Sequence, residues 1–194
     1  MNAVRPGYGV RLESAARLLE THTPVATVEE QWSAPMRLSA YLGDVDLPTE
    51  IPGRVRCLVT DGETVLITWD AAGPKCLPGG GAKPGETVVE TARREVWEET
   101  GWWIDPESVE TLGWIHVESL VEAGDAPRYP HPDDFHKVVT ARPSHPDEGH
   151  EDWVDTEGHV DRSEFVPLDL IPGAVLANPV ERAFLYRATG AGLA

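Results

Sequence analysis

A run of three glycines that leads into an acidic helical segment restricts the fold of this chain more than any other feature. Residues 79–81 are all glycine, and the helical segment that follows ends near residue 102. Its second half carries three carboxylates, on Glu95, Glu98 and Glu99. Successive helical residues are rotated by about 100°, so these side chains fall within one arc of the helix surface. The sequence therefore predicts an acidic helix face next to a glycine loop.

Three negative charges on one helix face repel one another, and carboxylates four residues apart destabilise a helix. Taken singly, each of these glutamates is an ordinary solvated surface residue. Together they are retained either because water screens them or because a cation binds there. Oxygen ligands suit hard divalent ions, so the triplet predicts a Mg²⁺ site, with Mn²⁺ as the alternative metal.

The same stretch resembles the Nudix box, a motif with many fixed positions. The matching positions, in order, are Gly80, Glu86, Arg94-Glu95-Val96, Glu98-Glu99, Gly101 and Trp102. The departure is Trp102, a large apolar residue where an aliphatic one is usual. The resemblance is to the Nudix hydrolases, with the subgroup unknown, and extends loosely from about residue 53 to residue 186. It implies an α/β fold, the Nudix-type α/β/α sandwich with a mixed central sheet, whereas the element pattern alone indicates only α/β or α+β.

The resemblance also implies a reaction and a set of roles. The reaction is hydrolysis of the diphosphate linkage in a nucleoside diphosphate linked to another moiety, by attack of a metal-activated water on phosphorus. Glu95, Glu98 and Glu99 would hold Mg²⁺ together with a backbone carbonyl near Gly79, and Arg94 would orient a glutamate. A non-catalytic nucleotide-binding sensor on the same scaffold is the alternative.

The general base is left open by the motif. Acidic residues are frequent between residues 142 and 164, and they include Asp147, Glu148, Glu151, Asp152 and Glu157. We predict Glu148 or Glu151 as the base, and Glu95 if no acid of this segment reaches the water. The plain alternative for this segment is a solvated acidic loop.

Substrate contacts are predicted from basic and aromatic residues near the motif. Arg54, Arg56 and Lys83 are candidates for binding phosphate, although exposed arginines on a strand have the same appearance. Five aromatic residues are candidates for stacking on a base or for packing in the core: Trp69, Trp102, Trp103, Trp114 and Tyr129.

Charge and composition restrict the partners. The formal net charge is −17, from 33 acidic and 16 basic residues. This charge repels nucleic acid and anionic membrane surfaces, so a small nucleotide neutralised by metal is the predicted partner. No apolar run approaches the roughly 20 residues that span a bilayer, and we expect no secretory signal. Two isolated cysteines suit a reducing compartment, so the predicted location is cytoplasmic.

The chain is predicted to divide into an N-terminal helix/strand extension, residues 1–50, and a Nudix hydrolase domain, residues 51–194. In the extension the pattern predicts a helix over 9–21, a loop over 24–35 and a strand over 36–42. The extension is either an extra strand-helix layer or a dimer arm, and a homodimer is therefore left open.

The second part is predicted as strands and two capped helices. A strand over 54–60 and another over 64–69 flank the turn residues Asp61-Gly62, a hairpin signal. A loop over 70–74 and a brief strand over 75–77 follow. Thr87 and Glu90 form a capping box, and Val88, Ala92 and Val96 should face a sheet. Strands over 109–120 and 135–141, a loop over 142–164 and a helix from Asn178 to Gly190 complete the pattern.

Overall fold

The computed structural model describes residues 11–51, 53–122, 130–147, 153–155, 158 and 160–190. The elements, in order, are α1 (Glu13–Thr21), β1 (Ala26–Gln31), β2 (Pro35–Leu42), β3 (Arg54–Val59), β4 (Thr64–Asp70), β5 (Gly73–Lys75), α2 (Val88–Thr100), β6 (Trp102–Ile104), η1 (Pro106–Ser108), β7 (Glu110–Ser119), β8 (Asp133–Ala141), β9 (Pro143–Pro146), β10 (Arg162–Pro167), η3 (Leu168–Leu170), α3 (Gly173–Ala177) and α4 (Pro179–Thr189). None of the described helices is long and apolar enough to cross a membrane.

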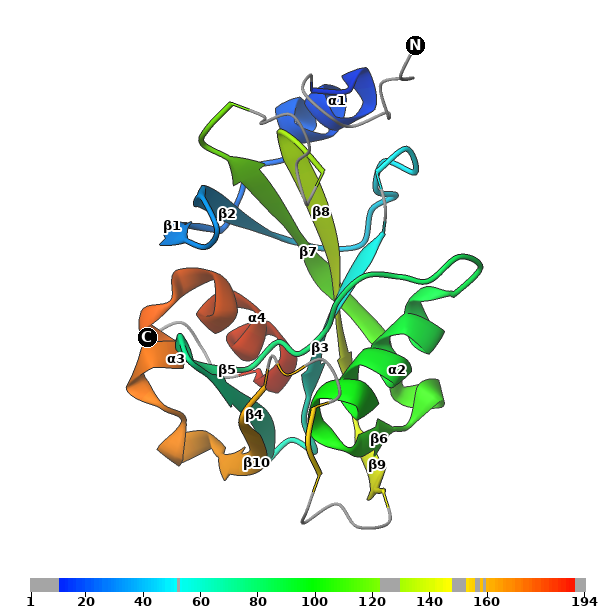
Figure 1. The fold of residues 1–194 in the computed structure, drawn as a ribbon, viewed down its shortest axis with the longest axis vertical. Helices are drawn as coiled ribbons and strands as arrows, with labels where there is room; N and C mark the ends of the chain where they lie inside the picture. The colour runs from blue at the N-terminus through cyan, green and yellow to red at the C-terminus, as the bar shows by residue number, and fades with distance from the viewer. Residues whose placement is uncertain are drawn as a thin grey trace.

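A mixed five-stranded sheet lies between the helices. Its order is β1-β2-β7-β8-β3, with β3 parallel to β8 and the other neighbours antiparallel. A second sheet has the order β10-β4-β5, and β6 pairs with β9. Helices α2 and α4 lie on opposite sides of the central strands (Figure 1). The predicted α/β class with a mixed central sheet is confirmed.

Strand β3 separates two apolar clusters because its side chains alternate between faces. Val55 and Cys57 are buried with Ala92 and Val96 of α2. On the other face, Leu58 is buried in the cluster that contains residues of α4. Burial raises the pKa of the Cys57 thiol to about 12, so this cysteine is a small apolar residue of the core rather than a thiolate.

The predicted loop over residues 24–35 is wrong, because β1 forms there. Ala26 pairs with Ala40 and Gln31 with Pro35, so β1 and β2 make an antiparallel hairpin that joins the central sheet beside β7. Half-buried and exposed side chains alternate along β1. The acidic residues in its second half hide this alternation from a hydrophobicity pattern. The division at residue 51 stays a prediction.

The Asp61-Gly62 turn is present, but it does not close a hairpin. Asp61 Oδ1 accepts the N–H groups of Glu63 and Thr64, and a single bridge joins Thr60 to Val65. Beyond it the strands separate into different sheets, since β3 pairs with β8 and β4 pairs with β10 and β5. The predicted hairpin ladder is therefore wrong.

Smaller differences concern boundaries and one helix residue. The short strand expected over 75–77 is β5, two residues earlier, and the segment expected as a loop over 142–164 contains β9 and the start of β10. Ala92 and Val96 are buried against the sheet as predicted, whereas Val88 is 38% exposed. Val88 is the first residue of α2.

Candidate active site

The glycine loop runs along the free edge of β3 and is held there by backbone hydrogen bonds. Val55 N–H donates to the Gly80 carbonyl, and Cys57 N–H donates to the Pro78 carbonyl, each over 2.9 Å. Gly79 has φ +141°, and a Cβ at this position would lie 2.1 Å from the Val55 carbonyl oxygen. A residue with a side chain does not fit there, so this glycine allows the loop to approach the strand.

Helix α2 is capped at both ends as the sequence predicts. Thr87 Oγ1 accepts the Glu90 N–H, and the Glu90 carboxylate accepts the Thr87 N–H, which is a capping box. Gly101 is left-handed with φ 70°, and its N–H donates to the Trp97 carbonyl. The caps and the buried face of α2 fix the rotation of the helix, and the acidic residues face the glycine loop.

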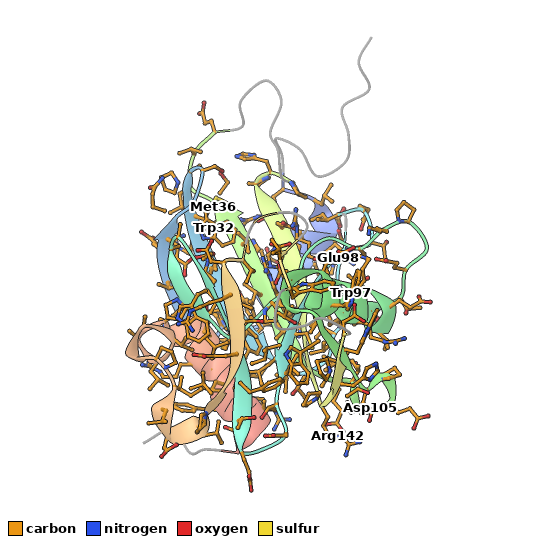
Figure 2. All side chains as sticks on the ribbon, turned by 60° about the horizontal axis from the view of Figure 1, so that its bottom comes forward. Trp32, Met36, Trp97, Glu98, Asp105 and Arg142 are labelled. Carbon is orange, nitrogen blue, oxygen red and sulfur yellow. The ribbon has the colours of Figure 1, made fainter. Side chains whose placement is uncertain are left out.

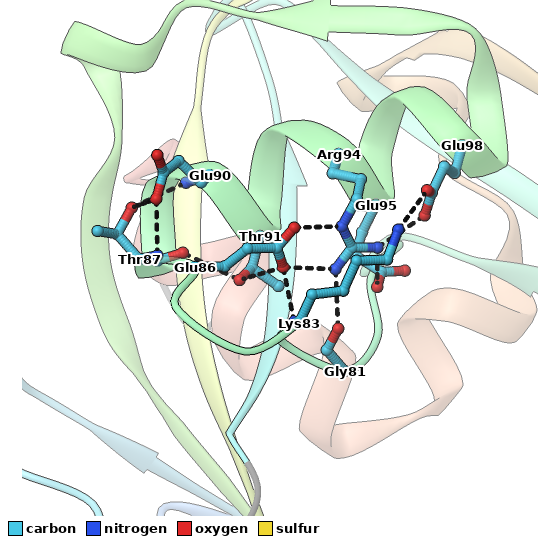
Figure 3. A network of polar contacts seen from close by, with 9 residues as sticks. All are labelled: Gly81, Lys83, Glu86, Thr87, Glu90, Thr91, Arg94, Glu95 and Glu98. Atoms are coloured by element: carbon cyan, nitrogen blue, oxygen red, sulfur yellow. Dashed lines mark hydrogen bonds and ion pairs between the residues drawn. The ribbon is translucent and has the colours of Figure 1, made fainter.

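Arg94 is the centre of a polar network that joins the loop to the helix (Figure 3). Its Nε and Nη2 donate to both Glu86 oxygens, at 2.6 and 2.8 Å, and Nη2 also donates to the Gly81 carbonyl. Nη1 donates to Glu95 and to Glu98, each over 2.7 Å. The bonds from Arg94 lower the pKa of Glu86 to about 2. One guanidinium therefore neutralises acidic side chains from both segments.

A cavity of about 430 Å³ lies between the glycine loop, α2, β3 and the β4–β5 pair. Glu95 and Glu99 border it. The Glu95 carboxylate lies against Gly80, where a Cβ would be 2.6 Å from Oε2. Glu99 Oε2 accepts the Gly79 N–H over 3.1 Å. Burial raises the pKa of Glu99 to about 7, although the positive charge of Arg56 lowers it in part.

The three basic residues predicted to bind phosphate all border this cavity. Arg56 Nη1 donates to the Gly79 carbonyl over 2.6 Å. Arg54 Nε is 2.7 Å from Asp134 Oδ2, and Lys83 Nζ is 3.1 Å from Glu98 Oε1. The walls therefore place cationic groups opposite the acidic helix, an arrangement that suits a ligand carrying phosphates and a cation.

Glu98 is placed differently from the other two glutamates of the predicted triplet. Its carboxylate lies between Lys83 and Arg94 and is not part of the cavity wall. Figure 2 labels Glu98 next to Trp97 on α2. Of the predicted base candidates, Glu148 and Glu151 lie outside the described residues, and Asp147 accepts the Trp97 indole N–H over 3.1 Å.

Asp155 is an acidic residue near the site that the sequence did not indicate. It is 5% exposed, and its negative charge contributes to the raised pKa of Glu99. Asp155 Oδ2 accepts the Val160 N–H over 2.9 Å, and Val160 borders the cavity. The sequence feature that could have indicated Asp155 is the glycine three residues later. The Gly158 N–H donates to the Asp155 carbonyl in a turn.

The aromatic candidates for base stacking mostly pack against protein groups. Trp114 is fully buried and stacks on Tyr41 with a centroid distance of 3.8 Å. Trp102 contacts Phe165, and Trp103 stacks on Trp97. The Arg162 guanidinium covers the Trp69 ring at 3.8 Å. Tyr129 lies outside the described residues.

Comparison with known proteins places the chain in a family. A model of the NUDIX domain matches residues 51–187. The chain belongs to the Nudix family. The predicted recognition is therefore confirmed, and the match covers most of the chain, including the glycine loop and α2 of this Nudix protein.

Individual relatives agree with this family. Nudix hydrolase 3 of Caenorhabditis elegans is 49% identical over 87 residues, which cover 41% of this chain and 35% of that protein. This Nudix protein thus spans about a third of that relative. The structure resembles a mutant form of the Bacillus subtilis pyrophosphohydrolase BsRppH (TM-score 0.57, 17% identity, 81% of this chain and 93% of that one). It also resembles a Nitrosomonas europaea Nudix hydrolase (TM-score 0.51, 16% identity, 72% and 89%). These likenesses confirm the predicted Nudix fold.

The donor set at the cavity fits a hard divalent ion in part. Within the described ranges, no three His, Cys, Asp or Glu side chains lie close enough together to hold a metal ion. Arg94 provides the counter-charge for Glu95 and Glu98 here. However, Glu95 and Glu99 border one cavity with Gly79, and Gly80 leaves room for the Glu95 carboxylate. These oxygens are of the kind that Mg²⁺ and Mn²⁺ prefer.

Replacing Arg94 with lysine should destabilise this Nudix protein, although the charge is conserved. Lysine cannot reproduce the planar fork that bonds Glu86, Glu95 and Glu98, and these acids would repel one another. We expect the free energy of unfolding to fall by about 1–3 kcal/mol, measured by urea denaturation. Arg17→Lys is the control, because Arg17 forms an exposed pair with Glu13. Equal denaturation midpoints for wild type and Arg94→Lys would contradict the role of Arg94.

Proposed function

We propose that this Nudix protein is a Mg²⁺-dependent hydrolase that cleaves the diphosphate linkage in a nucleoside diphosphate linked to another moiety. The observation that carries the proposal is the cavity where Glu95 and Glu99 face Arg54 and Arg56 beside the glycine loop. The family assignment supports it, and the Bacillus subtilis structural relative is named a pyrophosphohydrolase. Nudix proteins generally use divalent cations, and Mn²⁺ is the alternative metal.

Each group of the cavity has a role in this proposal. Glu95 and Glu99 would hold the metal with the Gly79 carbonyl, and Glu98 would help through Arg94, with which it forms a 2.7 Å ion pair. When bound, the metal neutralises phosphate oxygens and lowers the pKa of a water. Arg54 and Arg56 would bind phosphate oxygens from the β3 side.

The proton of the attacking water must go to a carboxylate near the cavity. Glu95 borders the cavity, and it is our candidate if no acid of the 142–164 segment reaches the water. Glu148 and Glu151 stay predictions. The neighbouring Asp155 is a further candidate because it is buried close enough to influence Glu99.

The proposal also concerns the partners, the location and the oligomeric state of the protein. With a net charge of −17, the protein should act on small nucleotides neutralised by metal rather than on nucleic acid or at a membrane surface. We propose a cytoplasmic location, which suits two buried free cysteines. A homodimer stays a prediction that sedimentation analysis can test.

A substrate panel tests the proposed function. The panel contains nucleotide sugars, ADP-ribose, dinucleoside polyphosphates and modified nucleoside triphosphates, each with Mg²⁺ or Mn²⁺, and products are identified by mass spectrometry in ¹⁸O-labelled water. We expect the label in one phosphate-containing product, which locates the attacked phosphorus, and no product after addition of EDTA. Tight binding of a nucleotide with no product in any reaction would favour the non-catalytic sensor.

A further inference from the structure

A second, smaller cavity adjoins the one described above. It has a volume of about 90 Å³ and shares Arg56, Lys75 and Leu77 with the larger cavity. Its outer wall comes from the β1–β2 hairpin, which contributes Glu30 and Trp32. A ligand whose diphosphate occupies the larger cavity could therefore extend past Lys75 into the smaller one.

Trp32 is an aromatic side chain held in place at the rim of this cavity. Its indole N–H donates to Glu30 Oε2 over 2.7 Å. The other oxygen of Glu30 accepts the Asn178 side-chain N–H, also over 2.7 Å, which ties the hairpin to the start of α4. Trp32 is nevertheless 38% exposed, and Figure 2 labels it on the hairpin. A fixed but exposed ring loses little conformational freedom when a planar ligand stacks on it.

Carboxylates give this cavity hydrogen-bond acceptors. Each Glu30 oxygen has one bonded donor and retains a lone pair for another. Glu181, only 9% exposed, also borders the cavity, and its Oε2 accepts the Cys76 N–H over 2.9 Å. Burial raises the pKa of Glu181, so Glu30 is the carboxylate expected to accept hydrogen bonds from a ligand. The remaining lone pairs of Glu30 can accept N–H groups from a ring, whereas Arg56 and Lys75 are donors in the same wall.

We propose that the smaller cavity is the subsite for an amino-substituted nucleobase, with Trp32 stacking on the ring and Glu30 accepting its amino N–H. This inference rests on the proposed function for the position of the diphosphate. Glu30 and Trp32 precede residue 51 and thus lie outside the segment that matches the family. The N-terminal segment of this chain would then determine which base is bound.

Equilibrium binding tests the subsite without requiring turnover. Isothermal calorimetry with Mg²⁺ compares three probes: ADP, purine riboside 5′-diphosphate, which lacks the amino group, and methylenediphosphonate, which has no base. We expect wild type to bind ADP at least about tenfold more tightly than methylenediphosphonate, as stacking predicts. Purine riboside 5′-diphosphate should bind with intermediate affinity.

Variants of the β1–β2 hairpin test whether it causes the difference in affinity between ADP and methylenediphosphonate. Trp32→Ala should weaken ADP binding about tenfold and leave methylenediphosphonate binding unchanged, whereas Trp32→Phe should keep most of the ADP affinity. Glu30→Gln should reduce the preference for ADP over purine riboside 5′-diphosphate. Gln31→Ala is the control, because this side chain is exposed on the same hairpin and does not border the cavity.

The outcomes separate this inference from the proposed function. Equal affinity of wild type for ADP and methylenediphosphonate would overturn the subsite, even if the protein hydrolyses the panel substrates. An equal loss for both probes in Trp32→Ala would also overturn it, because the hairpin would then support the fold only. Base-dependent binding without hydrolysis would retain the subsite and reject the proposed function.

Discussion

Glu99→Gln is expected to reduce hydrolysis of the diphosphate linkage by about 10³-fold. The amide oxygen of glutamine can still accept the Gly79 N–H, so the contact between α2 and the glycine loop is kept. What is lost is a negative charge at the cavity wall, and with it affinity for a divalent cation. The measurement is kcat on a substrate identified for wild type, at saturating Mg²⁺.

The same substitution should leave the fold intact. Burial disfavours the charged form of Glu99 and raises its pKa to about 7. Removing that charge should therefore not lower the melting temperature measured by circular dichroism. Glu107→Gln is a matched control, since Glu107 is exposed in η1, outside the cavity, and should keep full activity. Wild-type kcat in a folded Glu99→Gln protein would reject the assignment of this carboxylate.

Features set by neighbouring residues could be predicted from the sequence. The capping box of Thr87 and Glu90 and the left-handed Gly101 define both ends of α2. Asn178, whose side chain accepts from the first turn of α4, defines the start of the last helix. These signals are reliable because the groups that bond are only two to four residues apart.

Strand pairing could not be predicted in the same way, because the partners are distant in the sequence. Asp61-Gly62 forms its turn, but the two strands that it joins pair with other segments. The edge of β3 is already occupied by the glycine loop, through the bonds of Val55 and Cys57. A local turn signal therefore predicts the change of direction and not the partner of either strand.

The site shows the same division between local and distant information. Helical spacing predicted that three glutamates share one arc of α2. It could not predict that their contacts with the glycine loop differ. Glu95 lies against Gly80 and Glu99 bonds to the Gly79 N–H, whereas Glu98 is held by Lys83 outside the cavity. Asp155 belongs to a segment that comes well after α2 in the sequence, and the spacing within the motif does not predict that this segment lies near Glu99.

Gly79→Ala is expected to lower the free energy of unfolding by about 3 kcal/mol or more. Two separate costs combine at this position. The φ of +141° is one that residues with a Cβ rarely adopt, and the added Cβ would lie 2.1 Å from the Val55 carbonyl oxygen and 3.0 Å from the Arg56 Cα. Both atoms belong to the backbone of β3, so neither can rotate away.

Two other glycines of the same loop separate these costs. Gly81 has no positive φ and no neighbour within 4 Å of an added Cβ, so Gly81→Ala should be nearly neutral. Gly85 has φ +88° and the same open surroundings, so Gly85→Ala should cost about 1 kcal/mol from backbone strain alone. Urea denaturation of the three variants measures the order of their free energies of unfolding. If Gly79→Ala is no less stable than Gly85→Ala, the close approach of the loop to β3 is incorrect, and with it the position of the Gly79 N–H opposite Glu99.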